Sequence, residues 1–202
     1  INKTIKTWRT IKMANNKYEF TGETRTVEIN EITYVVKRIK ALESLDPYGL
    51  DGDVNVGDLG GWIESEENLS QDGMCWVDEE AVIVGKAVVK DNAYVCGRST
   101  IKGEAIICDN STVDDDSIIA GNSVISGNSL IHENAQVLVN VVIKDKVEVK
   151  GWSIVHCEYS KPKVICENAE KMDEGLRQLI ALLSKGTESV ISGNIVIDSS
   201  ID

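Results

Sequence analysis

The sequence contains two histidines, His132 and His156, and these are its candidates for a catalytic general base. A histidine titrates near neutral pH, so it can take a proton from a hydroxyl or amine and return it later. A carboxylate beside the ring would orient it, and Asp114 lies eighteen residues before His132. Each histidine can equally be a solvated turn residue, and both interpretations remain open from the sequence.

Few side chains have the pattern of a metal site. Four oxygen-bearing residues resemble a calcium loop, namely Asp51, Asp53, Asn55 and Asp58. This segment has neither the glycine at the sixth position nor the glutamate at the twelfth, so an acidic surface loop is expected. The five cysteines are odd in number and form no C-x-x-C pair, which indicates neither a disulfide framework nor a zinc site. We expect no metal and no cofactor.

The strongest pattern in the sequence is a six-residue repeat that begins at Cys75 and continues to about residue 158. A small residue recurs every six positions, and an aliphatic residue follows two positions after it. Three six-residue sides would close a triangular coil of eighteen residues, and stacked coils would place residue i about 4.8 Å from residue i+18. The predicted inward columns are Val77/Val95/Val113/Ile131/Val149, Ile83/Ile101/Ile119/Val137/Val155 and Val89/Ile107/Ile125/Ile143.

The position of three cysteines in this repeat suggests their chemistry. Cys96 and Cys108 each lie one residue beyond a predicted inward position, so they are candidates for reactive thiols. Cys75 occupies a small-residue position and is expected to pack without reacting. Glycine, aspartate and asparagine follow the short strands, which is typical of turns with positive φ.

The repeat resembles a known family. The pattern [LIV]-x-x-x-[STAV]-x, as in Ile125–Leu130 and Val89–Tyr94, is similar to that of hexapeptide-repeat proteins, which fold as left-handed parallel β-helices. The segment G-D-L-G-G-W-I at residues 57–63 resembles a bacterial and phage group in this family. Its members carry a small N-terminal β-cap and are commonly labelled as transferases. The fold expected is therefore an all-β solenoid, a left-handed parallel β-helix with an N-terminal β-cap and a C-terminal α-helical excursion.

The chain divides into four predicted segments: a basic tail or extension (1–16), a β-cap (17–74), the β-helix (75–158), and a helix with a final partial coil (159–202). In the cap we expect strands on both sides of a turn at Asn30-Glu31. Gly60-Gly61 is expected to allow a sharp turn, and Trp62 to cover the open end of the apolar columns.

Residues 167–185 have apolar side chains at helical spacing, and we expect an amphipathic helix there. The residues on its apolar face are Met172, Leu176, Leu179, Ile180 and Leu183. The six-residue pattern then returns at residues 189–194.

One predicted outward column contains only aliphatic residues: Val88, Ile106, Val124 and Val142. Such a column would require a cover, supplied by the chain's own helix or by a neighbouring subunit. Relatives in the hexapeptide-repeat family commonly form trimers with closed symmetry, so we expect a homotrimer.

Composition and charge restrict the partners. No apolar run approaches the ~18 residues of a membrane-crossing helix, and no signal peptide is evident, so we expect a cytoplasmic protein without membrane contact. The net charge is −12, made up of +5 in residues 1–40 and −17 in residues 41–202. An acidic surface repels phosphate backbones, so we expect no direct nucleic-acid binding, whereas a basic protein could be a partner.

Two functions remain open. The first is a non-catalytic oligomeric binding scaffold with an acidic surface, and phage carriage of similar proteins suggests a host protein as its target. The second follows from the resemblance: family enzymes transfer acyl groups from donors such as acetyl-CoA with a histidine base between subunits, here His132 or His156. The long substrate-gripping loop of many acetyltransferase relatives is missing between residues 75 and 158, so we place the scaffold first.

Overall fold

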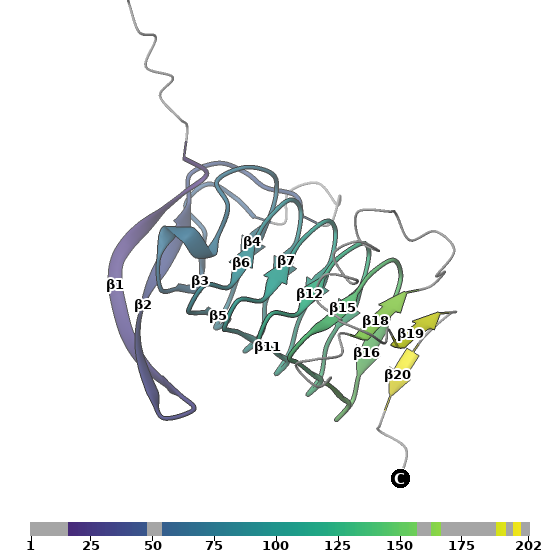
Figure 1. Cartoon of the computed structure of the whole chain (residues 1–202). Coiled ribbons are helices and arrows are strands. Elements are labelled where there is room, and N and C mark those ends of the chain that lie inside the picture. Colours follow the sequence, from purple (N-terminus) through teal and green to yellow (C-terminus); the bar gives the residue numbers. More distant parts are fainter. Residues whose placement is uncertain (1–15, 48–53, 157–162, 167–188, 193–195, 199–202) are drawn as a thin grey trace, which may run out of the picture.

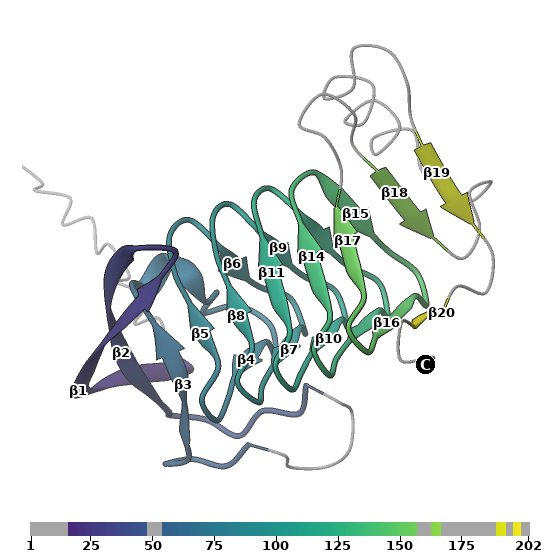
Figure 2. The ribbon, with the colours of Figure 1, turned by 90° about the horizontal axis from the view of Figure 1, so that it is seen from below.

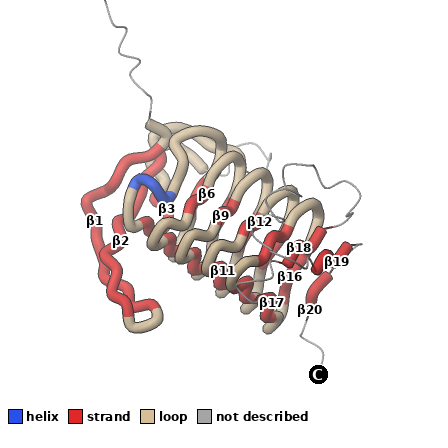
Figure 3. The backbone as a smooth tube through the Cα atoms, viewed as in Figure 1, coloured by secondary structure: helices blue, strands red, loops and turns tan. Residues whose placement is uncertain are grey.

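A computed structural model of the chain describes residues 16–47, 54–156, 163–166, 189–192 and 196–198. The chain winds into a parallel β-solenoid of about five turns, consistent with a left-handed β-helix, and an antiparallel hairpin covers its N-terminal end (Figure 1). Short strands alternate with tight turns along the whole solenoid (Figure 3). Among the described residues, no helix is long and apolar enough to span a membrane.

Three sheets form the walls, and Figure 2 shows their strands stacked in sequence along the axis. The first contains β1 (Tyr18–Ile29), β2 (Ile32–Ala41), β3 (Leu59–Ile63), β5 (Val82–Ile83), β8 (Thr100–Ile101), β11 (Ile118–Ala120), β14 (Gln136–Leu138) and β17 (Ile154–His156). The second contains β4 (Trp76–Val77), β7 (Tyr94–Val95), β10 (Thr112–Val113), β13 (Leu130–Ile131), β16 (Glu148–Lys150) and β20 (Val196–Asp198). The third contains β6 (Val88–Val89), β9 (Ile106–Ile107), β12 (Val124–Ile125), β15 (Val141–Ile143), β18 (Lys163–Cys166) and β19 (Ser189–Ser192). A short 3-10 helix, η1 (Glu66–Asn68), follows β3.

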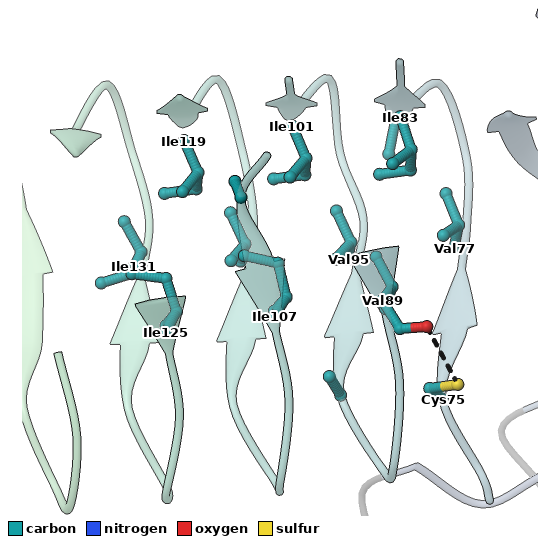
Figure 4. Close-up of a cluster of buried hydrophobic side chains, with 14 of the residues drawn as sticks. Cys75, Val77, Ile83, Val89, Val95, Ile101, Ile107, Ile119, Ile125 and Ile131 are labelled. Atoms are coloured by element: carbon teal, nitrogen blue, oxygen red, sulfur yellow. Dashed lines mark hydrogen bonds between the residues drawn. The ribbon is translucent and has the colours of Figure 1, made fainter. Parts of the chain in front are cut away.

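The predicted inward columns are confirmed. Ile101 pairs with Ile119 across neighbouring parallel strands, and the side chains of both are fully buried. The other two columns repeat this arrangement, and together they form one continuous core (Figure 4). Because each buried aliphatic side chain contributes about 1.5–3 kcal/mol, these columns are the main source of stability.

The turns of the solenoid share one backbone feature. Every sixth residue from 73 to 151 has a positive φ, as expected from the glycines and aspartates there. At Asp109 and Asp115 the side-chain carboxylate accepts a backbone N–H of the next coil, from Gly127 and from Glu133 respectively, each at 2.9 Å. The side chain therefore compensates for the unfavourable backbone conformation by fixing the spacing between coils.

Val139 is the exception at this turn position. Its φ is 57°, and a β-branched side chain is poorly tolerated in the left-handed region. We expect Val139→Asn to raise the free energy of unfolding by about 1 kcal/mol, because asparagine tolerates this conformation. Thermal unfolding followed by circular dichroism would measure it. Leu138→Asn in the adjacent strand is the control and should not stabilise; equal destabilisation by both variants would contradict the prediction.

The N-terminal cap continues the first sheet. The expected turn at Asn30-Glu31 is confirmed, with φ of 51° and 64°, and β1 pairs with β2 in antiparallel register with a shift between Phe20 and Thr24. Strand β3 then pairs antiparallel with β2 and parallel with β5. The cap thus joins the solenoid through hydrogen bonds along the edge of β5. These hydrogen bonds prevent that edge from pairing with a strand of another chain.

Two expectations for the cap are wrong. Gly60 and Gly61 lie inside β3 rather than at a sharp turn, and they are needed because a Cβ atom on Gly60 would lie 2.6 Å from the Val77 carbonyl oxygen. Trp62 lies on the outer face of the first sheet, paired with Val82, and not over the open end of the columns. Side chains alternate along a strand, so the neighbouring Ile63 is the one that points into the core.

At the C-terminal end, the coil that leads from β15 to β18 is longer than the eighteen-residue period. Ile143 pairs with Ile165 and not with residue 161, so this coil contains four additional residues. Strands β19 and β20 extend the third and second sheets, so the return of the repeat near residue 189 is confirmed. The predicted helix at 167–185 lies outside the described residues, and so do Met172, Leu176, Leu179, Ile180 and Leu183.

Candidate functional site

Carboxylates gather where the second sheet turns into the first. The eighteen-residue period stacks residues 78–80, 96–98, 114–116 and 132–134 at this corner, one coil above another. We call this set of carboxylates the acidic edge; its members are Asp78, Glu79, Glu80, Asp114, Asp115, Asp116 and Glu133.

Three arginines pair with members of the acidic edge. Arg25 and Arg38 from the cap both bind the Glu80 carboxylate, the latter at 3.0 Å, and both guanidinium groups lie over the Trp62 ring. Although partial burial raises the pKa of Glu80, these two hydrogen-bonding arginines lower it overall below its ordinary value. Trp62 thus stabilises a cation pair on the outside of the sheet, a role that the sequence did not indicate.

Arg98 lies in the same corner as the acidic edge and binds one further carboxylate there. Its Nε and Nη2 atoms contact the two oxygens of Asp116 at 2.7 and 2.6 Å, a bidentate arrangement. The hydrogen bonds from Arg98 hold the pKa of Asp116 below its ordinary value. Asp116 therefore stays ionised at neutral pH.

Backbone groups fix most of the other carboxylates. Asp78 accepts the Glu79 N–H at 2.8 Å and the Tyr94 hydroxyl at 2.7 Å, and Asp114 accepts the Asp115 N–H at 2.6 Å. Because these carboxylates are held by the turns, they can meet a cation without losing much side-chain freedom.

Four members of the acidic edge line a shallow depression of about 220 Å³. Its lining residues are Glu79, Glu80, Gly97, Arg98, Asp115 and Asp116. Pockets that enclose a whole small-molecule ligand usually have roughly 300–1,000 Å³, so this depression suits one long side chain better than a cofactor.

His132 directly follows β13 of the second sheet and lies in this same corner. Its Nε2 atom is 3.0 Å from Glu148 Oε1, and the Lys150 ammonium is 3.7 Å from the same oxygen. The carboxylate beside His132 is therefore Glu148, and the expectation of Asp114 at this place is wrong. Glu148 pairs with Leu130, in the adjacent outward column, and its side chain reaches the histidine diagonally. A period of eighteen does not reveal such diagonal contacts.

His156 is placed differently. It ends β17 on the first sheet, pairs with Leu138 in the strand register, and has an exposed side chain. His132 thus lies at a corner after the second sheet and His156 in the first sheet, and the structure does not bring them together.

The expectation of reactive thiols at Cys96 and Cys108 is wrong. Both side chains are buried, and their thiols donate to the carbonyl oxygens of Val113 and Ile125. Burial, followed by the charge of Asp109, raises the pKa of Cys108 to about 11. Asp91, Cys108 and Asp109 lie within 4.8 Å of one another, but a thiol that holds its proton is a poor metal ligand.

We therefore expect the Cys108 thiol to be alkylated by iodoacetamide at pH 8 at least tenfold more slowly in the native protein than in urea, roughly following its low thiolate fraction and burial. Mass spectrometry of the peptide that contains residue 108 would measure both rates. Equal rates in the two states would contradict the buried position of this thiol.

The aliphatic outward column lies on the third sheet. Val88, Ile106 and Val124 are half-buried, and Val142 is buried. Strands β18 and β19 continue the third sheet beyond β15. Asp51 and Asp53 of the calcium-like loop lie outside the described residues, and Asn55 donates its backbone N–H to Asp58 within a turn.

No protein-family model matches the chain, and no curated protein matches it. The geometry of these surfaces is therefore the basis for its proposed function.

Proposed function

We propose that the protein is a non-catalytic binding scaffold that holds a basic segment of a partner protein against the acidic edge. The observation that supports this most is the depression of about 220 Å³ lined by four carboxylates and one arginine. A lysine or arginine side chain from a partner matches its size and charge.

The surrounding charges support the same proposal. The acidic edge has seven carboxylates, and the three arginines that pair with them leave an excess of four negative charges. Complementary charge increases the association rate and selects partners more than it adds affinity. Binding of this type should therefore weaken strongly with salt.

A matched pair of variants tests the proposal. Glu79→Gln combined with Asp115→Asn removes two charges from the acidic edge and keeps the shape of the side chains. Asp91→Asn combined with Asp109→Asn makes the same change in net charge at another corner. We expect the wild type and the second variant to retain the same basic proteins from a lysate at low salt, and the first variant to lose them. Equal retention by both variants would contradict the proposal.

We further propose that the scaffold is a homotrimer, assembled through the aliphatic column on the third sheet. A row of stacked aliphatic side chains on an outer face is typical of an interface. Ile106→Glu should reduce the mass in solution to that of a monomer, measured by light scattering, because it places a charge in this row. Thr112→Glu on the second sheet is the control. A monomeric wild type, or no change in Ile106→Glu, would overturn this proposal.

A second function is favoured by one contact, the 3.0 Å approach of His132 to Glu148. In an acyltransferase, His132 would remove the proton of an acceptor hydroxyl or amine, and Glu148 would stabilise the imidazolium that forms. The acyl group would pass from the acetyl-CoA thioester to the acceptor, and the proton would go to the departing thiolate. Acetyl-CoA at 100 times its Kd would stabilise the protein by about 2.7 kcal/mol. No thermal shift with acetyl-CoA, in the wild type or in His132→Ala, would exclude this function.

A further inference from the structure

Lys17 is buried where the cap meets the first coil of the solenoid. Its side chain has no solvent exposure, and its Nζ atom lies 2.9 Å from Cys75 Sγ. The carbonyl oxygens of Asp72 and Gly73 are its other hydrogen-bond acceptors, each at 3.4 Å. Within the described part of the chain, no carboxylate pairs with this ammonium group. A buried lysine without a counter-ion is unusual, which draws attention to its sulfur neighbour.

Cys75 is oriented so that its sulfur faces this amine. The residue is fully buried, and its thiol can donate to the carbonyl oxygens of Ser70, Asp72 and Val89, at 3.6–3.7 Å. Figure 4 shows the contact with Val89. With the hydrogen directed to a carbonyl, a sulfur lone pair is free to face Nζ. The nitrogen–sulfur distance is shorter than each of these three sulfur–oxygen distances.

We propose that Lys17 and Cys75 form an oxidative crosslink in which one oxygen atom joins Nζ to Sγ. The ammonium, the thiol and one molecule of dioxygen give the N–O–S bridge, one water molecule and one proton. One oxygen atom enters the bridge and the other leaves in the water, and the four electrons that dioxygen accepts come from the nitrogen and sulfur centres. Two molecules of a dithiol reductant, each oxidised to its disulfide, would supply four electrons and restore the amine and the thiol, with the bridging oxygen leaving as water.

The geometry favours an oxygen bridge over a direct bond. Two single bonds that meet at a bent oxygen atom span a distance a few tenths of an ångström shorter than the 2.9 Å between Nζ and Sγ, so only a small approach of the two atoms is needed. A direct sulfur–nitrogen bond, as in a sulfenamide, would require the two atoms to move much closer together. Because both side chains are enclosed, the sulfur is also shielded from the further oxidation that exposed thiols undergo.

The crosslink would join two parts of the molecule that are 58 residues apart in sequence. Closing a loop of this length restricts the unfolded chain, as a disulfide does. The oxidised protein should therefore unfold at a higher temperature than the reduced one, and the cap should stay attached to the first coil.

Intact mass spectrometry of the full chain tests the proposal. After exposure to air-saturated buffer, we expect a mass increase of one oxygen atom minus two hydrogen atoms, which dithiothreitol reverses. Peptide mapping should find the peptide with residue 17 joined to the peptide with residue 75. No mass change, a gain of two or three oxygen atoms, or a loss of two hydrogen atoms alone would each overturn the proposal.

Variants separate the crosslink from a purely structural contact. Cys75→Ser and Lys17→Met should each abolish the mass increase. Methionine has a length similar to that of the lysine side chain but lacks the amine. Cys108→Ser is the control, because it removes another buried thiol and should leave the mass increase unchanged. The midpoint of thermal unfolding should differ between air-exposed and reduced protein in the wild type and in Cys108→Ser only. Persistence of the mass increase in Lys17→Met, or an equal midpoint difference in all variants, would contradict the crosslink.

Discussion

Replacing Ile119 by alanine is expected to lower the free energy of unfolding by about 2–5 kcal/mol. The Ile119 side chain has no solvent exposure and stacks between Ile101 and Val137 in the first inward column. Its loss would leave a cavity that the neighbouring coils cannot close, because their backbones are hydrogen-bonded at a fixed spacing. Urea unfolding followed by circular dichroism would measure the change.

Ile118→Ala is the matched control, since it removes the same side chain one position earlier in the same strand. Ile118 points outward and is half-buried, so we expect a loss below about 1 kcal/mol. A loss for Ile118→Ala as large as that for Ile119→Ala would show that the inward and outward faces are assigned incorrectly.

Gly60→Ala is expected to lower the free energy of unfolding by about 2–3 kcal/mol through overpacking. A Cβ atom at this position would lie 2.6 Å from Trp76 Cζ2, 2.6 Å from the Val77 carbonyl oxygen and 2.7 Å from Ile39 Cγ1. The carbonyl belongs to the backbone of the first coil and cannot move aside as a side-chain end could. Urea unfolding monitored by tryptophan fluorescence would report the loss directly.

Leu59→Ala, in the neighbouring position of β3, controls for general effects on that strand. Leu59 is 52% exposed, so its truncation should change stability by less than about 0.5 kcal/mol. If Gly60→Ala were as stable as Leu59→Ala, the close packing of β3 on the first coil would be wrong.

The six-residue period made the solenoid predictable because each coil repeats the same local constraints. Ile107 and Ile125 occupy the same position in successive coils, so their type and spacing alone indicate that they stack. The acidic turn residues could also be placed, since aspartate tolerates positive φ and its carboxylate can reach the next coil.

Contacts between columns and between segments could not be predicted in this way. The Glu148 side chain reaches His132 diagonally, which depends on rotamers rather than on spacing. The role of Trp62 depends on two arginines of the cap, and the short distance between Lys17 and Cys75 depends on how the cap docks on the first coil. These arrangements are tertiary, and no local pattern in the sequence encodes them.

In the solenoid, residue i stacks on residue i+18, with alternate side chains inside the prism. Nitroxide spin labels on cysteines introduced at Thr100 and Ile118 test this most directly, because both side chains point outward on paired strands. A second pair at Thr100 and Gln136 lies two coils apart. The native cysteines that react with the label are first replaced. In this background, the first pair should show strong dipolar broadening in the electron spin resonance spectrum, consistent with strands about 4.8 Å apart. The second pair should show much less; equal broadening in both, or none in the first, would contradict the stacked coils.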